Sequence, residues 1–179
     1  TLMNEFEFNP KRVVVWFSCG ATSAGAARLT VDKYKGRYPI SIVYTDPGYE
    51  HPDNQRFLKD CEDWFGQRVT ILKSDKYQDI YDVFKKTRYL VCVAGARWTT
   101  EMKKLVRRGY ENLESDIQIF GFDPSEVHRA DRFRQNNPEV HLETPLIDQN
   151  ITKADCLRMI RDAGIEIPAM YKMGYKNNN

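Results

Sequence analysis

Apolar runs and amphipathic stretches alternate along this chain of 179 residues. The runs RVVVWF (12–17) and ISIVYTD (40–46) are almost unbroken, which is typical of strands buried on both faces of a parallel sheet. Residues 68–73, 116–123 and 140–147 form three further runs that we predict to be extended. The pattern therefore predicts about five strands.

The stretches around these runs carry apolar residues at helical spacing. The clearest helix should begin at Thr152, which can cap it, with Asp155 at the capping-box position and Gly164 at its end. Another should follow Pro52 and stop at Gly66. In all, we predict helices over residues 22–34, 53–65, 77–90, 99–113, 125–135 and 152–164.

Strands separated by helices predict an α/β fold, a doubly wound and mostly parallel Rossmann-like sheet with helices on both faces. We expect the strand order 3-2-1-4-5. Right-handed crossovers place the ligand crevice at the carboxyl ends of the strands, where residues 18–23, 46–52, 74–77 and 121–132 should meet. No repeat or linker divides the chain, so we expect one domain over 1–179, with 1–11 as an N-terminal extension and 165–179 as a tail.

The charge balance argues against general nucleic-acid binding. The chain has 27 basic and 25 acidic residues, for a net charge of +2, whereas a nucleic-acid-binding domain tends to have a pI above roughly 9. No stretch approaches the roughly 18 apolar residues of a membrane span. The N-terminus TLMNEFEFNPKR lacks an apolar signal core, so we expect a cytoplasmic protein without a membrane partner.

The four cysteines give no sign of a metal or redox site. No two of them form C-x-x-C, and their wide scatter suggests reduced thiols in a cytosol. We interpret Cys61, Cys92 and Cys156 as small buried apolar residues.

The first strand runs into WFSCGATSAG (16–25), a cluster of small and hydroxyl residues. Gly20 allows a tight turn, and the free amides of the next helix should point into the crevice with the positive end of the helix dipole behind them. Ser18, Thr22 and Ser23 add hydroxyl groups, and this chemistry suits phosphate oxygens. Neither G-x-G-x-x-G nor a Walker A lysine is present, so charge must be neutralised from elsewhere or by a metal ion. The alternative is that these residues only cap the helix.

The second strand ends in Asp46, and Pro47 and Gly48 then force a turn. An acidic residue at this position commonly binds ribose hydroxyls. The alternative is an aspartate that serves only the turn or the next helix.

Together, SCGATS and TDPGYEHPDNQRFL resemble the PP-loop adenine nucleotide alpha-hydrolase group, and within it the phosphoadenylyl-sulfate (PAPS) reductase-like branch. The arginine segment of that branch is similar to GFDPSEVHRADRF, and its C-terminal part is similar to TPLIDQNITKADCLRMIRDAGIEIPAMYKMGY. The resemblance spans residues 12–175 and is strongest to the short forms carried by bacteriophages and prophages.

The resemblance implies that the loop after the first strand binds the pyrophosphate side of ATP, usually with Mg²⁺, and that Thr45 and Asp46 face the adenosine. Arg129 and Arg132 would bind a phosphate or sulfate group through their guanidinium forks, unless they form a solvated helix face. The implied nucleotide-binding residues are Ser18, Cys19, Gly20, Ala21, Thr22, Ser23, Thr45, Asp46, Gly48, Gly121, Arg129 and Arg132. Candidates for catalysis are Ser18, Arg129, Arg132 and Lys103.

The chain departs from the family pattern in its cysteines. Cys19 replaces a glycine and is either a reactive thiol at a helix N-terminus or a passive replacement. Trp98 stands where related phage sequences have a cysteine before a lysine pair, here Lys103 and Lys104. No C-x-x-C is present and no cysteine follows Cys156, so an iron–sulfur cluster is not expected and a cysteine-bearing tail is either cut away or absent.

Four other residues have weaker functional interpretations. We expect Tyr171 and Tyr175 to pack rather than to act in catalysis. His51 and His128 are general-base candidates only by residue type, and a solvated or hydrogen-bonded role is favoured for both.

Three functions remain after these observations. The first is ATP cleavage between the alpha and beta phosphates, with adenylation of an unknown acceptor. The second is a sulfonucleotide reductase-like protein without its catalytic thiol, and the third is a non-catalytic nucleotide-binding protein. The sequence identifies neither the acceptor nor the oligomeric state.

Overall fold

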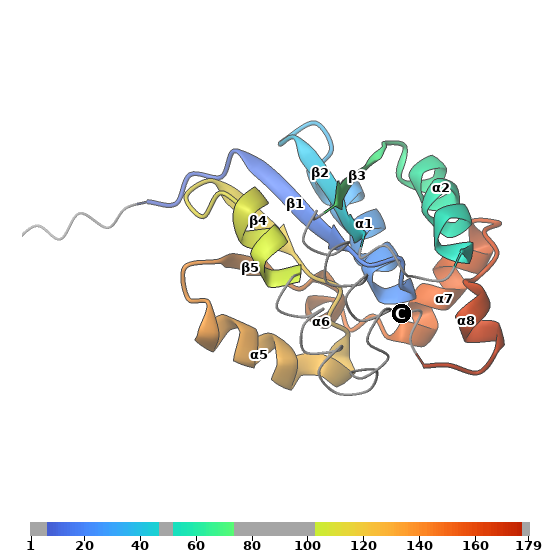
Figure 1. The fold of residues 1–179 in the computed structure, drawn as a ribbon. Coiled ribbons are helices and arrows are strands. Elements are labelled where there is room, and N and C mark those ends of the chain that lie inside the picture. The colour runs from blue at the N-terminus through green and yellow to red at the C-terminus, as the bar shows by residue number, and fades with distance from the viewer. Residues whose placement is uncertain (1–6, 47–51, 74–102, 177–179) are drawn as a thin grey trace, which may run out of the picture.

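The computed structural model describes residues 7–46, 52–73 and 103–176 (Figure 1). These residues form a five-stranded sheet in the order β3-β2-β1-β4-β5, in which every neighbouring pair is parallel. The predicted fold class and strand order are confirmed. The strands are β1 (Arg12–Phe17), β2 (Ile40–Asp46), β3 (Val69–Lys73), β4 (Asp116–Ile119) and β5 (His141–Glu143).

The register of the strands aligns their carboxyl ends. Phe17 lies opposite Tyr44, and Asp46 lies opposite Lys73. The residue after β1 is therefore level with the last residues of β2, so the loops that leave these strands start at the same edge of the sheet. A parallel sheet with right-handed crossovers requires this arrangement.

One face of the sheet is covered by α1 (Ala21–Tyr34), together with α2 (Asp53–Phe65), α6 (Pro145–Asp148) and α7 (Lys153–Asp162). Side chains of α1 and α2 share one buried cluster with alternate residues of β1, such as Val13 and Val15. Six of the nine buried residues of α1 are alanine, glycine or serine, and these small residues let the helix lie close to its neighbours.

The contact between α1 and α7 depends on a residue without a side chain. A Cβ atom at Gly25 would lie 2.6 Å from the sulfur of Cys156. The two helices therefore pack at a separation that only glycine permits at this point.

The other face of the sheet carries a buried chain of polar side chains. The Trp16 indole donates to Gln118 at 2.9 Å, and the Gln118 amide donates to Glu111 at 2.7 Å. Glu111 pairs with Arg107 at 3.1 Å, and their side chains are only 6% and 8% exposed. Arg107 also lies over the ring of Phe133, on α5 (Val127–Asn136), at 5.0 Å. This polar chain connects the sheet to the helical residues 103–110 and to α5.

Burial lowers the pKa of Arg107, and the carboxylate of Glu111 partly opposes that effect. The pair is therefore held in a low-dielectric environment, where each charge depends on its partner.

The predicted helix signals of α7 and α2 are confirmed. Thr152 and Asp155 form a reciprocal capping box at the start of α7. The Thr152 amide and hydroxyl, in that order, lower the pKa of the Asp155 carboxyl. Gly66 and Gly164 adopt left-handed φ values of 71° and 76°, which glycine tolerates.

The structure differs from the sequence prediction at four places. The helix predicted over 99–113 ends at Tyr110. β4 ends at Ile119, because the chain then turns past α1 and Asp123 caps a short 3-10 helix, η1 (Pro124–Glu126). Residues 140–147 are not extended throughout, since β5 is followed by α6, which has proline in its first turn. A last short helix, α8 (Ala169–Lys172), was not predicted.

Cys61 and Cys156 are buried as predicted, and burial raises the pKa of both thiols. The predicted helix 77–90 and Cys92 lie outside the described residues, and so does the first part of helix 99–113. Among the described helices, none has the length and apolarity needed to cross a membrane.

Candidate functional site

The loop after β1 is short and internally braced. The Ser18 amide donates to the Ser23 hydroxyl at 3.1 Å, and the Ser23 hydroxyl donates to the Gly20 carbonyl at 3.1 Å. The Ser18 hydroxyl lies 3.1 Å from that of Ser23. Ser23 is buried, whereas Ser18 is half-buried. Ser23 therefore fixes the turn, and Ser18 is the serine that can turn toward a ligand.

The N-terminus of α1 presents backbone amides at this loop. Gly20 is the N-cap residue, with extended backbone and no side-chain cap, and the first helical bond runs from the Ala24 amide to the Gly20 carbonyl. The amides of the first turn, Ala21 and Thr22 among them, therefore have no partner within the helix. An oxygen atom placed there would meet both a donor and the positive end of the helix dipole.

Cys19 adopts a left-handed φ of 59°, a conformation that glycine accepts freely and other residues rarely adopt. Its side chain is fully buried, with its sulfur 3.8 Å from the Asn54 carbonyl. A buried thiol has little access to a reagent or substrate, which favours the passive replacement over the reactive thiol.

Gly121 approaches the same loop from the end of β4. A Cβ atom at this position would lie 2.7 Å from both the amide nitrogen and the Cα of Ser23. The backbone of residue 121 thus passes directly against the first turn of α1, and only glycine fits without displacing it. The structure brings this predicted residue and the loop together.

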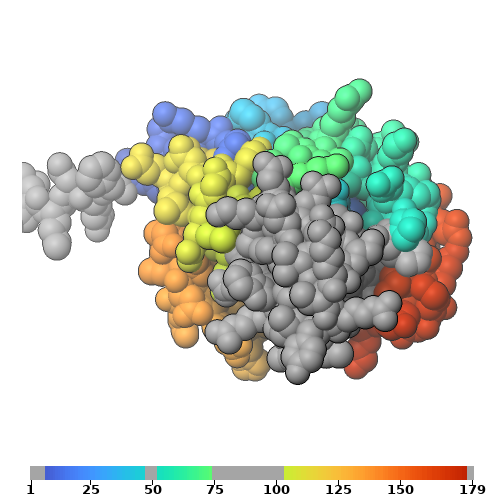
Figure 2. Space-filling view, viewed as in Figure 1, coloured from blue at the N-terminus to red at the C-terminus, as the bar shows by residue number. Residues whose placement is uncertain are grey.

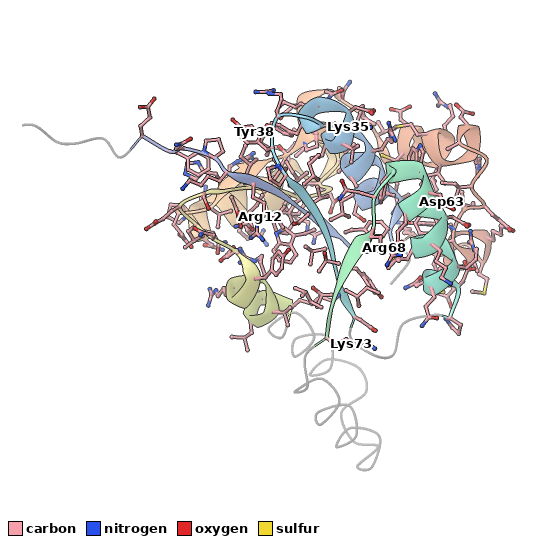
Figure 3. The ribbon with its side chains drawn as sticks, turned by 90° about the horizontal axis from the view of Figure 1, so that it is seen from above. Arg12, Lys35, Tyr38, Asp63, Arg68 and Lys73 are labelled. Atoms are coloured by element: carbon pink, nitrogen blue, oxygen red, sulfur yellow. The ribbon has the colours of Figure 1, made fainter. Side chains whose placement is uncertain are left out.

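Thr45 and Asp46 end β2, the strand beside β1, and both are half-buried. The Asp46 carboxylate lies 4.0 Å from the Lys73 ammonium group at the tip of β3. Figure 3 shows Lys73 at this end of the strand. Asp46 is therefore at the same sheet edge as the loop, with a lysine beside it. Gly48 and His51 lie outside the described residues.

Of the predicted site residues with basic side chains, Arg129, Arg132 and His128 lie on the exposed surface of α5. Arg129 pairs with Glu126 and lies 5.5 Å over the ring of Phe122, so its described contacts are within its own segment. Arg132 and His128 are exposed on α5, and Lys103 is half-buried at the start of the described helix 103–110. No described contact joins Arg129, Arg132 or His128 to the loop after β1. Trp98 lies outside the described residues.

Tyr171 reaches the loop from the other end of the chain, a contact that the sequence analysis missed. Its hydroxyl accepts a hydrogen bond from the Ala21 amide at 3.0 Å. Burial is the main cause that raises the pKa of this phenol, so it stays neutral at neutral pH. The sequence offered only a general indication of this contact, because a buried tyrosine usually has a hydrogen-bond partner for its hydroxyl group.

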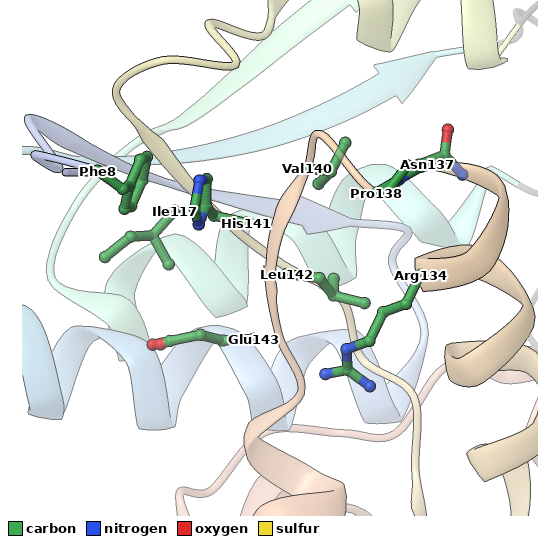
Figure 4. Close-up of a pocket in the computed structure, with 9 residues that line it drawn as sticks. All are labelled: Phe8, Ile117, Arg134, Asn137, Pro138, Val140, His141, Leu142 and Glu143. Atoms are coloured by element: carbon green, nitrogen blue, oxygen red, sulfur yellow. The ribbon is translucent and has the colours of Figure 1, made fainter. Parts of the chain in front are cut away.

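A cavity of about 460 Å³ lies elsewhere, between α5 and β5 (Figure 4). Its wall includes Phe8 and His141, whose rings are stacked, and also Arg134 and Glu143. None of the predicted nucleotide-binding residues lines it. We give this cavity no part in nucleotide binding, because none of its lining residues belongs to the loop after β1 or to the end of β2.

The described residues contain no group of three or more histidine, cysteine, aspartate or glutamate side chains that could bind a metal ion. Mg²⁺ is usually held by one or two carboxylates together with substrate phosphates. At this loop the phosphates of a nucleotide would supply the Mg²⁺ ligands, because the sequence analysis assigns Asp46 to the adenosine.

No family model matches the sequence, and no curated protein matches it. Solved structures do match in fold. U34-tRNA thiolase NcsA from Methanococcus maripaludis has a TM-score of 0.60 at 14% identity, over 89% of this chain and 59% of its own. NAD⁺ synthetase from Burkholderia pseudomallei has a TM-score of 0.52 at 14% identity, over 88% of this chain and 67% of its own.

An NH₃-dependent NAD synthetase from Campylobacter jejuni has a TM-score of 0.49 at 17% identity, over 65% of this chain and 49% of its own. This chain thus spans about three fifths of the length of the thiolase and about half of the length of the Campylobacter enzyme. At these identities the comparisons establish the fold alone. The chain has an α/β Rossmann-like fold that it shares with a tRNA thiolase and an NAD⁺ synthetase.

Proposed function

We propose that this chain binds ATP with its phosphates at the loop after β1 and cleaves the bond between the alpha and beta phosphates. The adenylyl group passes to an acceptor and pyrophosphate is released. The observation that carries this proposal is the braced turn at residues 18–23, where the first-turn amides of α1 and the Ser18 hydroxyl lie at the carboxyl edge of a parallel sheet.

The motif and the fold support the same class of enzyme. SCGATS resembles a PP-loop, and the solved structures of similar fold include a synthetase and a thiolase. The position of Asp46 at the end of β2 suits the ribose of an adenine nucleotide. We propose that the chain is a PP-loop enzyme that acts in the cytoplasm, and the PAPS reductase-like branch is the finer proposal.

The chemistry needs little beyond positioning and charge stabilisation. An acceptor atom forms a bond to the alpha phosphorus, the bond from that phosphorus to the bridging oxygen breaks, and pyrophosphate leaves with the electron pair. The proton of the acceptor passes to solvent. Amides of the first turn and the Ser18 hydroxyl hold the leaving pyrophosphate as its charge develops. Mg²⁺, when bound with the nucleotide, adds charge neutralisation.

Calorimetric titration with ATP, AMP and a sulfonucleotide, each with Mg²⁺, tests this proposal. We expect ATP to bind, and Ser18→Ala to weaken that binding by about 1–3 kcal/mol, since one buried hydrogen bond is lost. Ser41→Ala is the matched control, because Ser41 lies in β2 away from its carboxyl end and should leave the affinity unchanged. If Ser18→Ala has no effect, the Ser18 hydroxyl does not contact the nucleotide and the proposal loses its main support.

Pyrophosphate release then separates the alternatives. Release that requires an acceptor supports adenylation. Tighter binding of the sulfonucleotide than of ATP would instead favour the reductase-like branch, and binding without turnover would indicate a nucleotide-binding protein that performs no chemistry.

A further inference from the structure

We propose that the Tyr171 hydroxyl occupies the position of a phosphate oxygen at the loop after β1, so that the closing segment, residues 165–176, competes with the nucleotide. This inference rests on the proposed function and adds a form of regulation to the same site. Nucleotide binding would displace Tyr171 and release the segment.

The geometry of the contact supports this competition. The Tyr171 oxygen accepts from the Ala21 amide at 3.0 Å, and it lies 3.5 Å from the place where a Cβ atom of Gly20 would stand. A neutral oxygen acceptor at a helix N-terminus does in part what a phosphate oxygen does there. One N–H group cannot give a full hydrogen bond to both oxygens, so the phenol and a phosphate oxygen compete for the Ala21 amide.

The closing segment is tethered near α2. The Ala169 amide donates to the Asp53 carboxylate at 2.8 Å, and the guanidinium group of Arg56 bonds both Asp53 and the Glu166 carbonyl, the latter at 2.7 Å. In Figure 2 the teal residues of α2 lie directly against the red closing residues. These contacts hold Tyr171 within reach of the loop.

A further contact comes from α7. The Lys153 ammonium lies 5.3 Å from the centre of the Tyr171 ring and donates to the Lys176 carbonyl. Ile165 and Ile167 anchor the start of the segment against the hydrophobic core, whereas no residue of α8 is fully buried and residues 172–176 are exposed. Parts of a chain with little buried apolar surface open at low free energy, so a ligand can displace α8 and, with it, Tyr171.

The contact should reduce the apparent affinity for nucleotide. A site that is competent only when Tyr171 has left binds in proportion to the fraction of open molecules. Any change that weakens the Tyr171 contact without touching the rest of the loop should therefore strengthen binding.

Tyr171→Phe tests this, because it removes only the hydroxyl group. We expect the dissociation constant for ATP to fall about three- to tenfold, the factor that corresponds to one ordinary hydrogen bond. Tyr175→Phe is the matched control: it lies in the same segment and is 58% exposed, so affinity should not change. Unchanged or weaker binding by Tyr171→Phe overturns the proposal, and weaker binding would show that the phenol holds the nucleotide itself.

Hydrogen–deuterium exchange of the unaltered protein gives an independent readout. Saturating ATP should speed exchange in residues 166–176 while it slows exchange at the Ala21 amide. Slower exchange in both places would mean that the segment closes over the nucleotide, and the proposal would be wrong. If neither the unaltered protein nor Tyr171→Phe binds ATP, the proposed function itself fails. Equal binding of ATP by both proteins would overturn only the proposed competition by Tyr171.

Discussion

At the scale of single residues, the distinctive feature of the loop after β1 is the close packing of other backbone atoms against its own backbone. Gly121 passes against the first turn of α1, while Cys19 holds a left-handed backbone conformation inside the turn. The sequence indicated Gly121 through a resemblance and as part of the loop 121–132, but a glycine in the sequence does not reveal which backbone lies beside it. The structure supplies the physical reason, which is a contact that leaves no room for a methyl group.

Gly121→Ala should damage the loop. The new Cβ atom would stand 2.7 Å from the Ser23 backbone, and overpacking of this kind costs about 1–3 kcal/mol of stability. Because the displaced atoms belong to the first turn of α1, affinity for ATP should fall as well.

Urea unfolding and calorimetry measure the two effects of Gly121→Ala. Gly109→Ala provides the control, since an added Cβ atom there meets nothing within 4 Å. Its stability should be unchanged or slightly raised, because alanine favours helix over glycine. Equal behaviour of the two variants would show that the approach at Gly121 has no consequence.

At the scale of elements, α1 is positioned by the helix that packs against it. α7 packs along α1, and the contact between Gly25 and Cys156 sets the separation of the two helices. The capping box of α7 was predictable from Thr152 and Asp155 because a cap is a local signal. The pairing of Gly25 with Cys156 was not, because it joins residues 131 positions apart in the sequence.

Gly25→Ala and Cys156→Ala should therefore be coupled. Gly25→Ala alone places a methyl group 2.6 Å from the Cys156 sulfur and should lose about 1–3 kcal/mol. In a chain that already carries Cys156→Ala, the methyl group enters the space left by the sulfur. Thermal unfolding of both single variants and the double variant measures the coupling. A double variant as unstable as the sum of the two single variants would contradict this account of the packing.

At the scale of the whole molecule, the apolar runs and helix signals sufficed to predict the class of fold and the strand order. They did not predict the polar chain from Trp16 to Arg107, because its members look like ordinary polar residues until the chain folds around them. The contact between Tyr171 and Ala21 was hidden for the same reason, since it joins opposite ends of the described chain. Local sequence patterns are enough to predict the helices and strands, whereas contacts between residues far apart in the sequence complete the candidate site.

Glu111→Gln tests the importance of the buried polar chain. Removing the carboxylate leaves the cation of Arg107 buried without its countercharge, which should cost about 3–5 kcal/mol of folding free energy. Arg108→Gln is the control, because Arg108 is exposed and its loss should change stability by no more than about 0.5 kcal/mol. Equilibrium unfolding in urea distinguishes the two. A small effect of Glu111→Gln would mean that solvent reaches this pair.

The central position of β1 has a consequence for synthesis in the cell. Arg12 on β1 bonds Asp116 on β4 at 2.6 Å, across 104 positions of sequence. A ribosome that adds 5–20 residues per second needs about 5–20 s to cover that distance. Throughout that delay one edge of the most apolar strand has no native neighbour, and its amides and carbonyls can pair with another nascent chain. Chaperone supply during translation should therefore influence the yield of this protein more strongly than the stability of its finished fold would suggest.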